Sequence, residues 1–481
     1  MMVMPTWGRD TARQSWAGGE VIVTHPPPGP RTPGTAGADG IEPLSGVRQS
    51  AGPEPPGPAG ACPGPAGGRP GRRLRGTWMR LAVGAGELAS QASRRLRGGE
   101  GVVTRGRVVL ALDPGALSQL AAGRRVVLVT GTNGKTTTAH LLAAALRTLG
   151  PVAHNDSGAN MVDGAVAALA AQRDAPLAVL EVDELHLGRI ADAVAPAVVV
   201  VLNLSRDQLD RGAEVAAVAA SVQDALRRQP DTRIVANRDD PVVVAAVAGL
   251  PHVTWVAAGA TWSGDAAVCP ACGRRLTTAA EWSCRCGLSR PPAAFEFREG
   301  VVHGARTTTP LHLQLPGRFN LGNALAAMAA AQLLGVAPGD SAAAMADVQS
   351  VAHRYATVRH GRHELRLLLA KNPAGWAEML PLVRSCPALL VVVNAREADG
   401  RDTSWLWDVP FEDLAPRTVV GASGERAADV GLRLSYAGIR HDTEADPLAA
   451  VERFPPGVVA VVANYTAFAD LWHRLAGSAA R

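Results

Sequence analysis

Short apolar runs alternate with longer alanine- and leucine-rich stretches through most of the chain. Such runs, bounded by turn residues, are typical of strands buried on both faces, and the longer stretches between them predict helices. Alternating strands and helices predict an α/β fold with a parallel sheet covered on both faces. In the first part of the chain the predicted strands are 126–129, 177–182, 197–202, 233–236 and 311–315, and the predicted helices include 139–149, 164–172 and 324–334.

Near residue 355 the pattern restarts with further apolar strands at 365–369, 388–393, 418–421 and 458–462. Helical stretches separate these strands, which predicts a second, smaller α/β domain. We therefore expect one domain over residues 78–355 and a second over 356–481. A cysteine-rich segment at about 265–290 interrupts the first domain as an insertion.

The segment 1–77 is dominated by Gly, Pro, Ala and Arg. It cannot bury enough apolar surface to offset the entropy of ordering, so it is predicted to be disordered. Met79 begins a periodic stretch, with a helix predicted over 79–96 and a short apolar stretch over 102–112. Met79 is a candidate start of the working protein, and a functional tail is the alternative.

Composition narrows the class of protein. No apolar run in the 481 residues reaches the length of a membrane span, so no transmembrane helix is predicted. The net charge of +5 is small for this length, and the basic clusters 69–75 and 94–97 are read as solvated surface. The grouping of the six cysteines excludes a disulfide framework, and no secretory signal is recognisable. These features predict a protein of the reducing cytoplasm that does not bind nucleic acid.

One stretch has the chemistry of a phosphate-binding loop. A strand ends at Val129, a glycine turn and a Lys-Thr pair follow, and a helix comes next. Backbone N–H groups of such a turn and the positive end of the helix bind polyphosphate, a lysine adds charge, and a threonine hydroxyl can bind Mg²⁺. Val129 replaces the first Walker glycine, so the loop resembles the shorter ATP loop of Mur ligases and folylpolyglutamate synthases. The predicted nucleotide-binding residues are Gly131, Thr132, Asn133, Gly134, Lys135, Thr136 and Thr137.

Polar residues follow several predicted strands, where ligands of parallel sheets bind. Glu181 is the first choice for a Mg²⁺ ligand and Asp183 the second. Asn237 and Asp240 could contact a ribose or adenine, although their segment also has the composition of a common turn.

Asn320 and Asn323 lie three residues apart near the start of a predicted helix. At that spacing both can face one nucleotide, or one of them can cap the helix. The segment 203–211 also follows a strand and has two aspartates and two arginines, but it resembles an ordinary helix start.

Cysteine spacing predicts a metal site. The Cys269–Cys272 and Cys284–Cys286 pairs are separated by eleven residues, and together they supply four thiolates for tetrahedral zinc. With four protein ligands no position is left for substrate, so the zinc is expected to be structural. A nucleic-acid-binding ribbon is the alternative, with Arg274, Arg275 and Arg285 as its few basic residues.

Two loops of the second domain follow strands, at 369–375 and 394–408. The second is rich in charged residues, a usual composition for a functional loop, and Trp405 and Trp407 would anchor it or a partner. The domain has no evident nucleophile of its own, because Cys386 lacks a glycine elbow and is read as a core thiol.

From about Met79 to the C-terminus the chain resembles the MurT family, the ligase-like subunit of the enzyme that amidates lipid II. The motifs are GTNGKTTT (131–138), HNDSGANM (154–161), EVDE (181–184), RDQLDR (206–211), CPAC and CRC, GRFNLGN (317–323), LAKNPAG (369–375), DGRDTSW (399–405) and ANYT (463–466).

The resemblance implies a partner and a reaction. A GatD-like glutamine amidotransferase would release ammonia from glutamine. The MurT-like chain would use ATP to phosphorylate the D-glutamate α-carboxylate of the lipid II stem peptide, and ammonia would convert it to D-isoglutamine. This chemistry belongs to peptidoglycan synthesis at the inner face of the plasma membrane.

The resemblance also implies residue roles. Lys135 and Thr136 would bind phosphate and Mg²⁺, Glu181 would hold Mg²⁺, and Asn323 would contact the base. Asp402 would complete the Cys–His pair of the partner by orienting its histidine, with Asp408 as the second choice.

Two segments depart from Mur ligases. Gln208 replaces a histidine, so metal coordination is expected to differ. The segment 352–355 matches the expected glycine-arginine element poorly.

Two rival functions share part of this pattern. A stand-alone amino-acid ligase of the Mur or folylpolyglutamate synthase type would have the ATP loop, but it would need neither the cysteine cluster nor the D-x-S-W motif at 402–405. A zinc-ribbon ATPase acting on nucleic acid would show salt-sensitive binding and a basic, aromatic-rich face, which the sequence lacks.

Overall fold

The computed structural model describes residues 70–97, 102–156, 158–206, 215–259, 267–277, 281–304, 307–348, 351, 354–384, 386–414 and 418–479. The low-complexity segment 1–69, the stretch 207–211 with Gln208, and Ala352 with His353 lie outside these residues. Predictions that rest on them therefore stay predictions. The first described helix begins at Pro70, earlier than the predicted boundary at residue 77.

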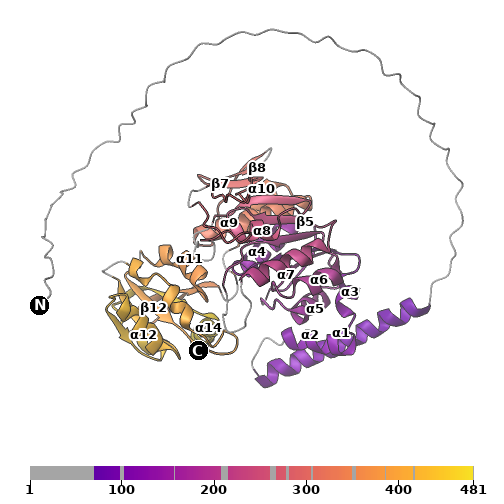
Figure 1. Cartoon of the computed structure of the whole chain (residues 1–481). Coiled ribbons are helices and arrows are strands. Elements are labelled where there is room, and N and C mark those ends of the chain that lie inside the picture. The colour runs from indigo at the N-terminus through magenta and orange to yellow at the C-terminus, as the bar shows by residue number, and fades with distance from the viewer. Residues whose placement is uncertain are drawn as a thin grey trace, which may run out of the picture. The chain divides into compact units, whose positions relative to one another are not determined.

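The described residues form two sheets (Figure 1). In the first sheet, strands β1 to β7 run parallel, and β8 and β9 add an antiparallel edge. In spatial order its strands are β2 (Val152–His154), β3 (Leu177–Glu181), β1 (Arg125–Thr130), β4 (Val198–Val201), β5 (Arg233–Asn237), β6 (Val253–Ala257), β7 (Phe295–Arg298), β8 (Val301–Gly304) and β9 (Thr308–Pro310).

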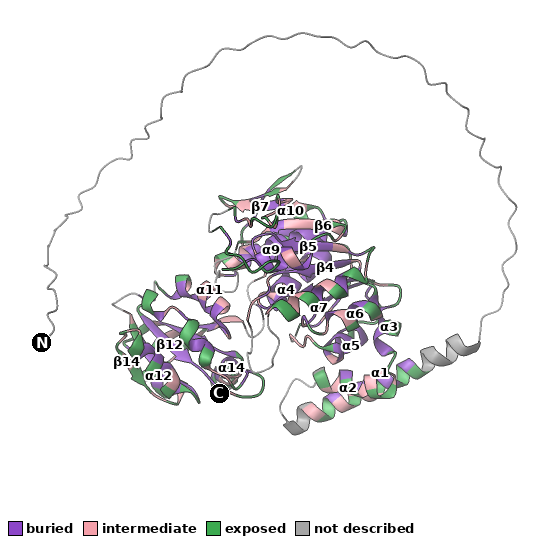
Figure 2. Ribbon diagram, in the orientation of Figure 1, coloured by how far each residue is buried: buried purple, intermediate pink, exposed green. Residues whose placement is uncertain are grey.

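Both faces of this sheet are buried, which is why its strands are continuous valine and leucine runs. Leu128 of β1 packs into one apolar cluster, and its neighbours Val127 and Val129 pack into the cluster on the opposite face. Figure 2 shows these strands as buried between their helices. Register pairs Val129 with Glu181 of β3, so a carboxylate lies at the strand end next to the glycine turn.

Helices cover the two faces unequally. Residues of α3, α5, α6, α7 and α8 join the cluster on one face, and residues of α4, α9 and α10 join the other. The helices of this part are α1 (Pro70–Arg97), α2 (Val102–Leu112), α3 (Ala116–Ala121), α4 (Lys135–Leu146), α5 (Val162–Ala171), α6 (Leu187–Val194), α7 (Val215–Arg227), α8 (Pro241–Ala246), α9 (Arg318–Leu333) and α10 (Pro338–Ala346).

The second sheet follows the same plan. An antiparallel edge strand precedes five parallel strands, and α11 and α12 pack on one face while α13 and α14 pack on the other. In spatial order the strands are β10 (Tyr355–His360), β11 (His363–Leu369), β15 (Gly457–Ala463), β12 (Ala388–Val392), β13 (Val419–Ser423) and β14 (His441–Thr443). The helices are α11 (Pro373–Val383), α12 (Ala427–Tyr436), α13 (Pro447–Glu452) and α14 (Tyr465–Ala479), with 3₁₀ turns η3 (Ser404–Asp408) and η4 (Phe411–Asp413).

The α/β fold class with a second sheet domain is confirmed. The structure adds one helix that was not predicted and corrects two local predictions. The apolar stretch 102–112 is helix α2, whose Gly106 lies so close to the backbone of Asp163 that a side chain would not fit. The segment 311–315 is not a strand, because the short strand β9 ends at Pro310. Helix α9 begins at Arg318 and not at 324.

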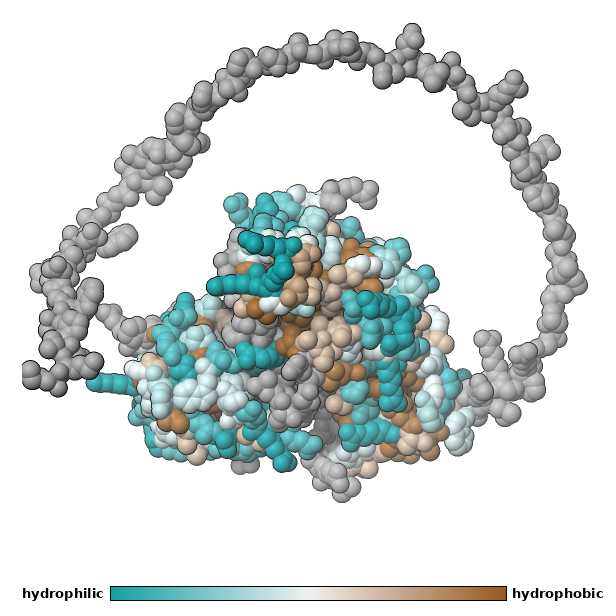
Figure 3. Space-filling model, viewed as in Figure 1, coloured by the Kyte–Doolittle hydropathy of each residue, from teal (hydrophilic) through white to brown (hydrophobic). Residues whose placement is uncertain are grey.

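Across the described residues, no helix combines the length and apolar character needed to span a membrane. On the face shown in Figure 3, hydrophilic residues are spread among smaller hydrophobic patches.

Candidate active site

The glycine turn connects β1 to α4 at the carboxyl end of the first sheet. Gly134 is the residue before the helix, and its φ of 86° is in the left-handed region that favours glycine. A side chain at this position would also collide with the amide of Asn323 on α9. The turn therefore presents backbone at the N-terminus of α4, as a phosphate-binding loop requires.

Lys135 lies inside this loop and is only 7% exposed. Its Nζ donates to the carbonyl oxygen of Gly131 at 2.5 Å and lies 3.5 Å from a carboxylate oxygen of Glu184. A lysine held in this way places a buried positive charge where a polyphosphate would meet the turn.

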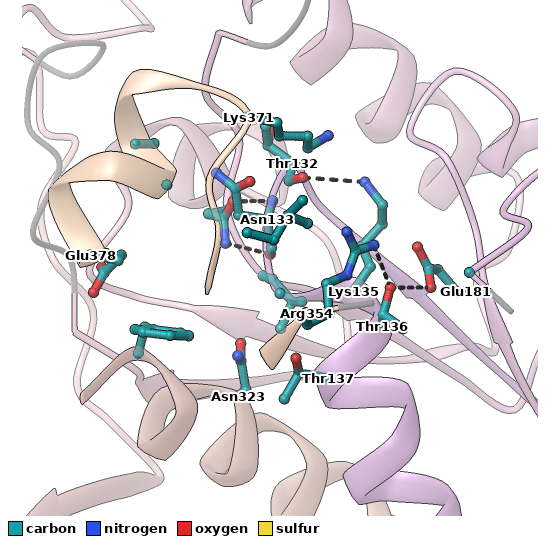
Figure 4. Close-up of a pocket in the computed structure, with 18 of the residues that line it drawn as sticks. Thr132, Asn133, Lys135, Thr136, Thr137, Glu181, Asn323, Arg354, Lys371 and Glu378 are labelled. Atoms are coloured by element: carbon teal, nitrogen blue, oxygen red, sulfur yellow. Dashed lines mark hydrogen bonds between the residues drawn. The ribbon is translucent and has the colours of Figure 1, made fainter. Parts of the chain in front are cut away.

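Thr136 and Glu181 are joined directly. The Thr136 hydroxyl donates to Oε2 of Glu181 at 2.7 Å, and Arg354 donates from Nη2 to the same hydroxyl oxygen at 2.8 Å (Figure 4). Burial raises the pKa of the Glu181 carboxyl, and the nearby charges of Arg354 and Lys135 act in the opposite direction. The two predicted Mg²⁺ ligands therefore lie together, next to a cation of the protein. Asp183, the second choice, lines the same cavity.

Two side-chain amides hold the glycine turn and the end of β3, where Glu181 lies, in place. Asn203 accepts from the backbone N–H of Asn133 and donates to its carbonyl oxygen, both at 2.9 Å. Asn155 donates to the carbonyl oxygen of Glu181 at 2.9 Å and accepts from its N–H at 2.8 Å. These paired hydrogen bonds fix the backbone at Asn133, in the predicted phosphate-binding turn, and at Glu181, the predicted Mg²⁺ ligand.

The side chains of Thr132 and Asn133 are engaged within the protein. Thr132 Oγ1 accepts from the N–H of Ser205 at 2.9 Å. Asn133 and Asn372, the N-cap of α11, exchange amide hydrogen bonds of 3.1 and 3.3 Å. The backbone N–H groups of both residues are also engaged, because both donate to Asn203. Thr132 and Asn133 therefore shape the turn, and the N–H groups at the start of α4 are the ones left to face a phosphate.

A cavity of about 620 Å³ opens over the loop. Its volume lies within the ordinary range for small-molecule sites. One part of its wall comes from the second sheet and the segment before it, and includes Arg354, Lys371 and Glu378 (Figure 4). Tyr465 also lines the cavity. Sequence-predicted residues that line it are Thr132, Asn133, Gly134, Lys135, Thr136, Thr137, Glu181, Asn237, Asp240, Asn320 and Asn323.

Asn320, Asn323 and Asp240 line the cavity and also have partners within the protein. Asn323 donates to Oδ1 of Asn320 at 3.1 Å, and both asparagines lie inside α9, whose N-cap is Gly317. Capping by an asparagine is therefore not what the structure shows. Asp240 instead caps α8, accepting from Val242 at 2.8 Å, so its carboxylate has a structural partner besides any ligand.

The segment from the end of β12 to the end of η3 is held at two points. Asp399 accepts from the N–H of Thr466 at 2.8 Å, and buried Arg433 donates to the carbonyl oxygen of Val409 at 2.6 Å. Asp402 is partly exposed and accepts from the N–H of Ser404 at 2.8 Å. Asp408 is paired with Arg206 at 3.2 Å.

The four cysteines converge. All four Sγ atoms lie within 4.8 Å of one another, with Cys269 and Cys286 at 3.6 Å and Cys272 and Cys284 at 3.5 Å. Tetrahedral zinc with Zn–S bonds of about 2.3 Å needs sulfur separations of about 3.8 Å. The cluster therefore fits one structural zinc ion.

Comparison with known proteins shows the family of the chain. Residues 129–266 match the Mur ligase middle domain, and residues 369–468 match the MurT ligase C-terminal domain. Subunit MurT of the lipid II isoglutaminyl synthase (glutamine-hydrolyzing) of Streptococcus pneumoniae (strain ATCC BAA-255 / R6) is 31% identical over 393 residues, which are 75% of this chain and 88% of that protein. The chain belongs to the MurT family.

A second MurT, from Staphylococcus aureus (strain N315), is 28% identical over 82% of this chain and 97% of its own length. Among solved structures, a pseudomurein peptide ligase type C from Methanothermus fervidus superposes with a TM-score of 0.61 at 19% identity, covering 74% of this chain and 79% of that one. This likeness shows a shared fold. The chain is thus a ligase of the Mur ligase family, whose members use ATP and Mg²⁺, and it acts in cell-wall peptidoglycan synthesis.

This MurT family member has cavity residues that the sequence analysis did not select. Arg354 belongs to the segment judged a poor match to the glycine-arginine element, yet it reaches Thr136. Lys371 lies in the quoted motif LAKNPAG, but no role was derived for it. Asn203 lines the cavity, and Asn155 lies behind it as the partner of the Glu181 backbone. Both follow strands, and that position was the available signal.

Proposed function

We propose that this chain is the ligase subunit of a two-subunit enzyme that amidates lipid II, with a GatD-like glutamine amidotransferase as its partner. The observation that carries the proposal is the joining, in one cavity, of the phosphate loop and Glu181 with Arg354 and Lys371. The reaction and the partner come from the names of the MurT relatives and from the resemblance of the motifs.

Activation begins with ATP on the loop. Backbone N–H groups at the N-terminus of α4 and the Lys135 ammonium bind the phosphates, and Asn323 faces the base side of the cavity. An oxygen of the D-glutamate α-carboxylate attacks the γ-phosphorus, and the bond from that phosphorus to the bridging oxygen breaks, releasing ADP. Arg354 and Lys371 lie on the cavity wall where they can balance the charge of the transferred phosphoryl group.

Thr136 and Glu181 are the residues that would hold Mg²⁺, because a hydroxyl and a carboxylate oxygen are hard ligands. The ion would neutralise charge on the phosphate oxygens during transfer. Arg354 must then exchange its contact with the Thr136 hydroxyl for a contact with phosphate.

Ammonia completes the reaction. Its nitrogen attacks the acyl carbon, the bond from that carbon to the phosphate oxygen breaks, and inorganic phosphate leaves as one proton passes to solvent. The product is D-isoglutamine in the stem peptide. The partner would generate the ammonia, and Asp402 would orient the partner's catalytic histidine.

We also propose the domain boundaries, the bound metal and the place of catalysis. The boundaries 78–355 and 356–481 separate the ATP-binding domain from the MurT-type domain, and the four cysteines hold structural zinc. Catalysis takes place in the cytoplasm at the inner membrane face, where lipid II is presented. A stand-alone ligase would have no use for a MurT C-terminal domain, and that domain opposes the alternative.

Separating the two activities tests the proposal. In the complex with the glutaminase, Lys135→Ala and Glu181→Ala should lower amidation of lipid II by about 100- to 1000-fold, the usual loss for a preorganised electrostatic contact. Glutamine hydrolysis by the complex should persist. Arg274→Ala on the exposed side of the cysteine cluster is the matched control and should amidate normally. Undiminished amidation in the first two variants would remove this site from the reaction.

A further inference from the structure

The cysteine-rich segment is attached to the wall of the nucleotide cavity. We define the cysteine ribbon as residues 267–277 and 281–290, which form two small bridged turns around the four thiols. Its apolar side is buried, with Cys269 and Trp282 packed against Val244 of α8 and Trp255 of β6. The ribbon therefore rests on the two elements that follow and flank β5.

A partly buried ion-pair network, in which Glu281 is exposed, adds a polar connection. Arg290 of the ribbon donates through its guanidinium to Oδ1 of Asp239, with a distance of 2.7 Å from Nε, and donates from Nη1 to Glu281 at 2.5 Å. Arg238 donates to Glu281 at 3.3 Å and to the carbonyl oxygen of Pro291 at 2.8 Å. Arg238 and Asp239 are at most 9% exposed, so the pairing is shielded from solvent.

Asp239 continues this network into the cavity wall. Its other oxygen, Oδ2, accepts from the N–H of Gly259 at 2.6 Å, and its own N–H donates to the side chain of Asn237 at 3.0 Å. Gly259 and Asn237 both line the cavity. Asp239 thus joins a ribbon arginine to two parts of the wall, to Gly259 through its carboxylate and to Asn237 through its backbone N–H.

The wall has little room to adjust. Gly322 of α9 packs against the carbonyl oxygen of Ala258, so closely that a side chain would collide with it. Asn323, the residue after Gly322, faces the phosphate loop. Helix α9 packs against the segment 258–259. A displacement of that segment would therefore shift α9, and with it Asn320 and Asn323 in the cavity wall.

From these contacts we infer that the cysteine ribbon is a positioning element for the nucleotide site, and that Asp239 and Arg290 are the positioning residues that transmit its placement. This inference rests on the proposed function only in taking ATP as the ligand of the cavity. The ribbon does not touch the reacting groups, so its loss should weaken nucleotide affinity and leave the transfer step unchanged.

Nucleotide binding to the full chain tests this inference without partner or lipid. Mg²⁺–ATP affinity is measured by titration calorimetry, and zinc content is measured on the same samples. Arg290→Ala should weaken ATP binding by about tenfold, the equivalent of one lost charge-assisted hydrogen bond. Arg290→Lys keeps the charge without the forked geometry and should recover part of the affinity. Arg274→Ala, on an exposed ribbon arginine, should bind ATP as the wild type does.

Asp239→Asn provides a variant outside the ribbon, in case Arg290→Ala releases zinc. It should retain zinc and still bind ATP more weakly, and in the amidation assay KM for ATP should rise while kcat is kept. Wild-type affinity in zinc-loaded Arg290→Ala and in Asp239→Asn would overturn the inference alone. A wild-type chain that does not bind ATP would overturn the proposed function and the inference together.

Discussion

At the scale of single residues, the candidate site combines a buried carboxyl group, Glu181, with nearby cationic side chains. Glu181 is fully enclosed, and its carboxylate meets the Thr136 hydroxyl and two neighbouring cations. Burial of a carboxylate favours its neutral form, and here burial outweighs the cations and raises the pKa of Glu181. The residue is therefore placed for binding a metal ion at the expense of the stability of the free protein.

This balance predicts a pH dependence. The pKa of Glu181 is higher in the folded protein than in the unfolded chain, so folding favours the protonated acid. The free energy of unfolding of the wild type therefore falls as the pH rises from the ordinary pKa of a glutamate to the pKa of Glu181 in the folded protein. Glu181→Gln cannot ionise and escapes this loss. The gain in unfolding free energy of Glu181→Gln over the wild type should thus be larger at pH 8 than at pH 5, in urea denaturation without nucleotide. A gain that shrinks as pH rises would contradict the charge balance.

At the scale of elements, the sequence predicts most of what local pattern determines. The strands buried on both faces were recognisable as unbroken apolar runs. The glycine sequence predicted the turn between β1 and α4, and the cysteine spacing predicted that the four thiols converge. Helix α2 was not recognised, because its valines favour strands locally and packing against α5 decides its conformation. The start of α9 was placed too late, because Asn320 and Asn323 resemble residues before a helix.

Contacts between distant segments account for what the sequence could not predict. Arg354 and Thr136 are 218 residues apart, and Asn133 and Asn372 are 239 apart. No spacing rule links such positions; only the assembled fold brings them together. Asp239 is a similar case, because its segment has the composition of a turn and its partner Arg290 lies beyond the cysteines.

The cysteine ribbon supports a prediction at this scale. One zinc ion per chain should be found by metal analysis, and Cys269→Ser should lose it, because Cys269 is the buried ligand of the four. The midpoint of thermal unfolding should fall, since the variant removes a metal crosslink and exposes the apolar face around Trp282. Cys386→Ser alters a buried thiol of the second sheet and should keep the zinc. A wild-type protein without zinc would refute the metal assignment.

At the scale of the whole molecule, the site depends on both sheets. The first supplies the phosphate loop and Glu181, and the second supplies Lys371 and the loop that carries Asp402. Arg433 holds that loop through backbone carbonyl oxygens and lies 5.8 Å from the ring centre of Trp407. A fixed, partly exposed carboxylate is suited to a contact made only in a complex.

The partner contact gives a prediction of its own. Asp402→Asn should lower glutamine hydrolysis by the complex about 10⁴-fold, the loss known for an aspartate that orients a catalytic histidine. Amidation supplied with free ammonia should persist, because the ATP site is unchanged. Asp408→Asn is the matched comparison and should affect hydrolysis much less, since Asp408 is paired with Arg206. Unchanged hydrolysis in Asp402→Asn would exclude this residue from the partner's triad.

The reaction itself is the central claim, and mass spectrometry of lipid II tests it most directly. The chain is purified with the candidate glutaminase and incubated with lipid II, ATP, Mg²⁺ and glutamine. We predict the mass change for one hydroxyl replaced by one amino group, located at the α-carboxylate of D-glutamate and absent when ATP is omitted. Lipid II of unchanged mass, with an active glutaminase and bound ATP, would contradict the proposed function.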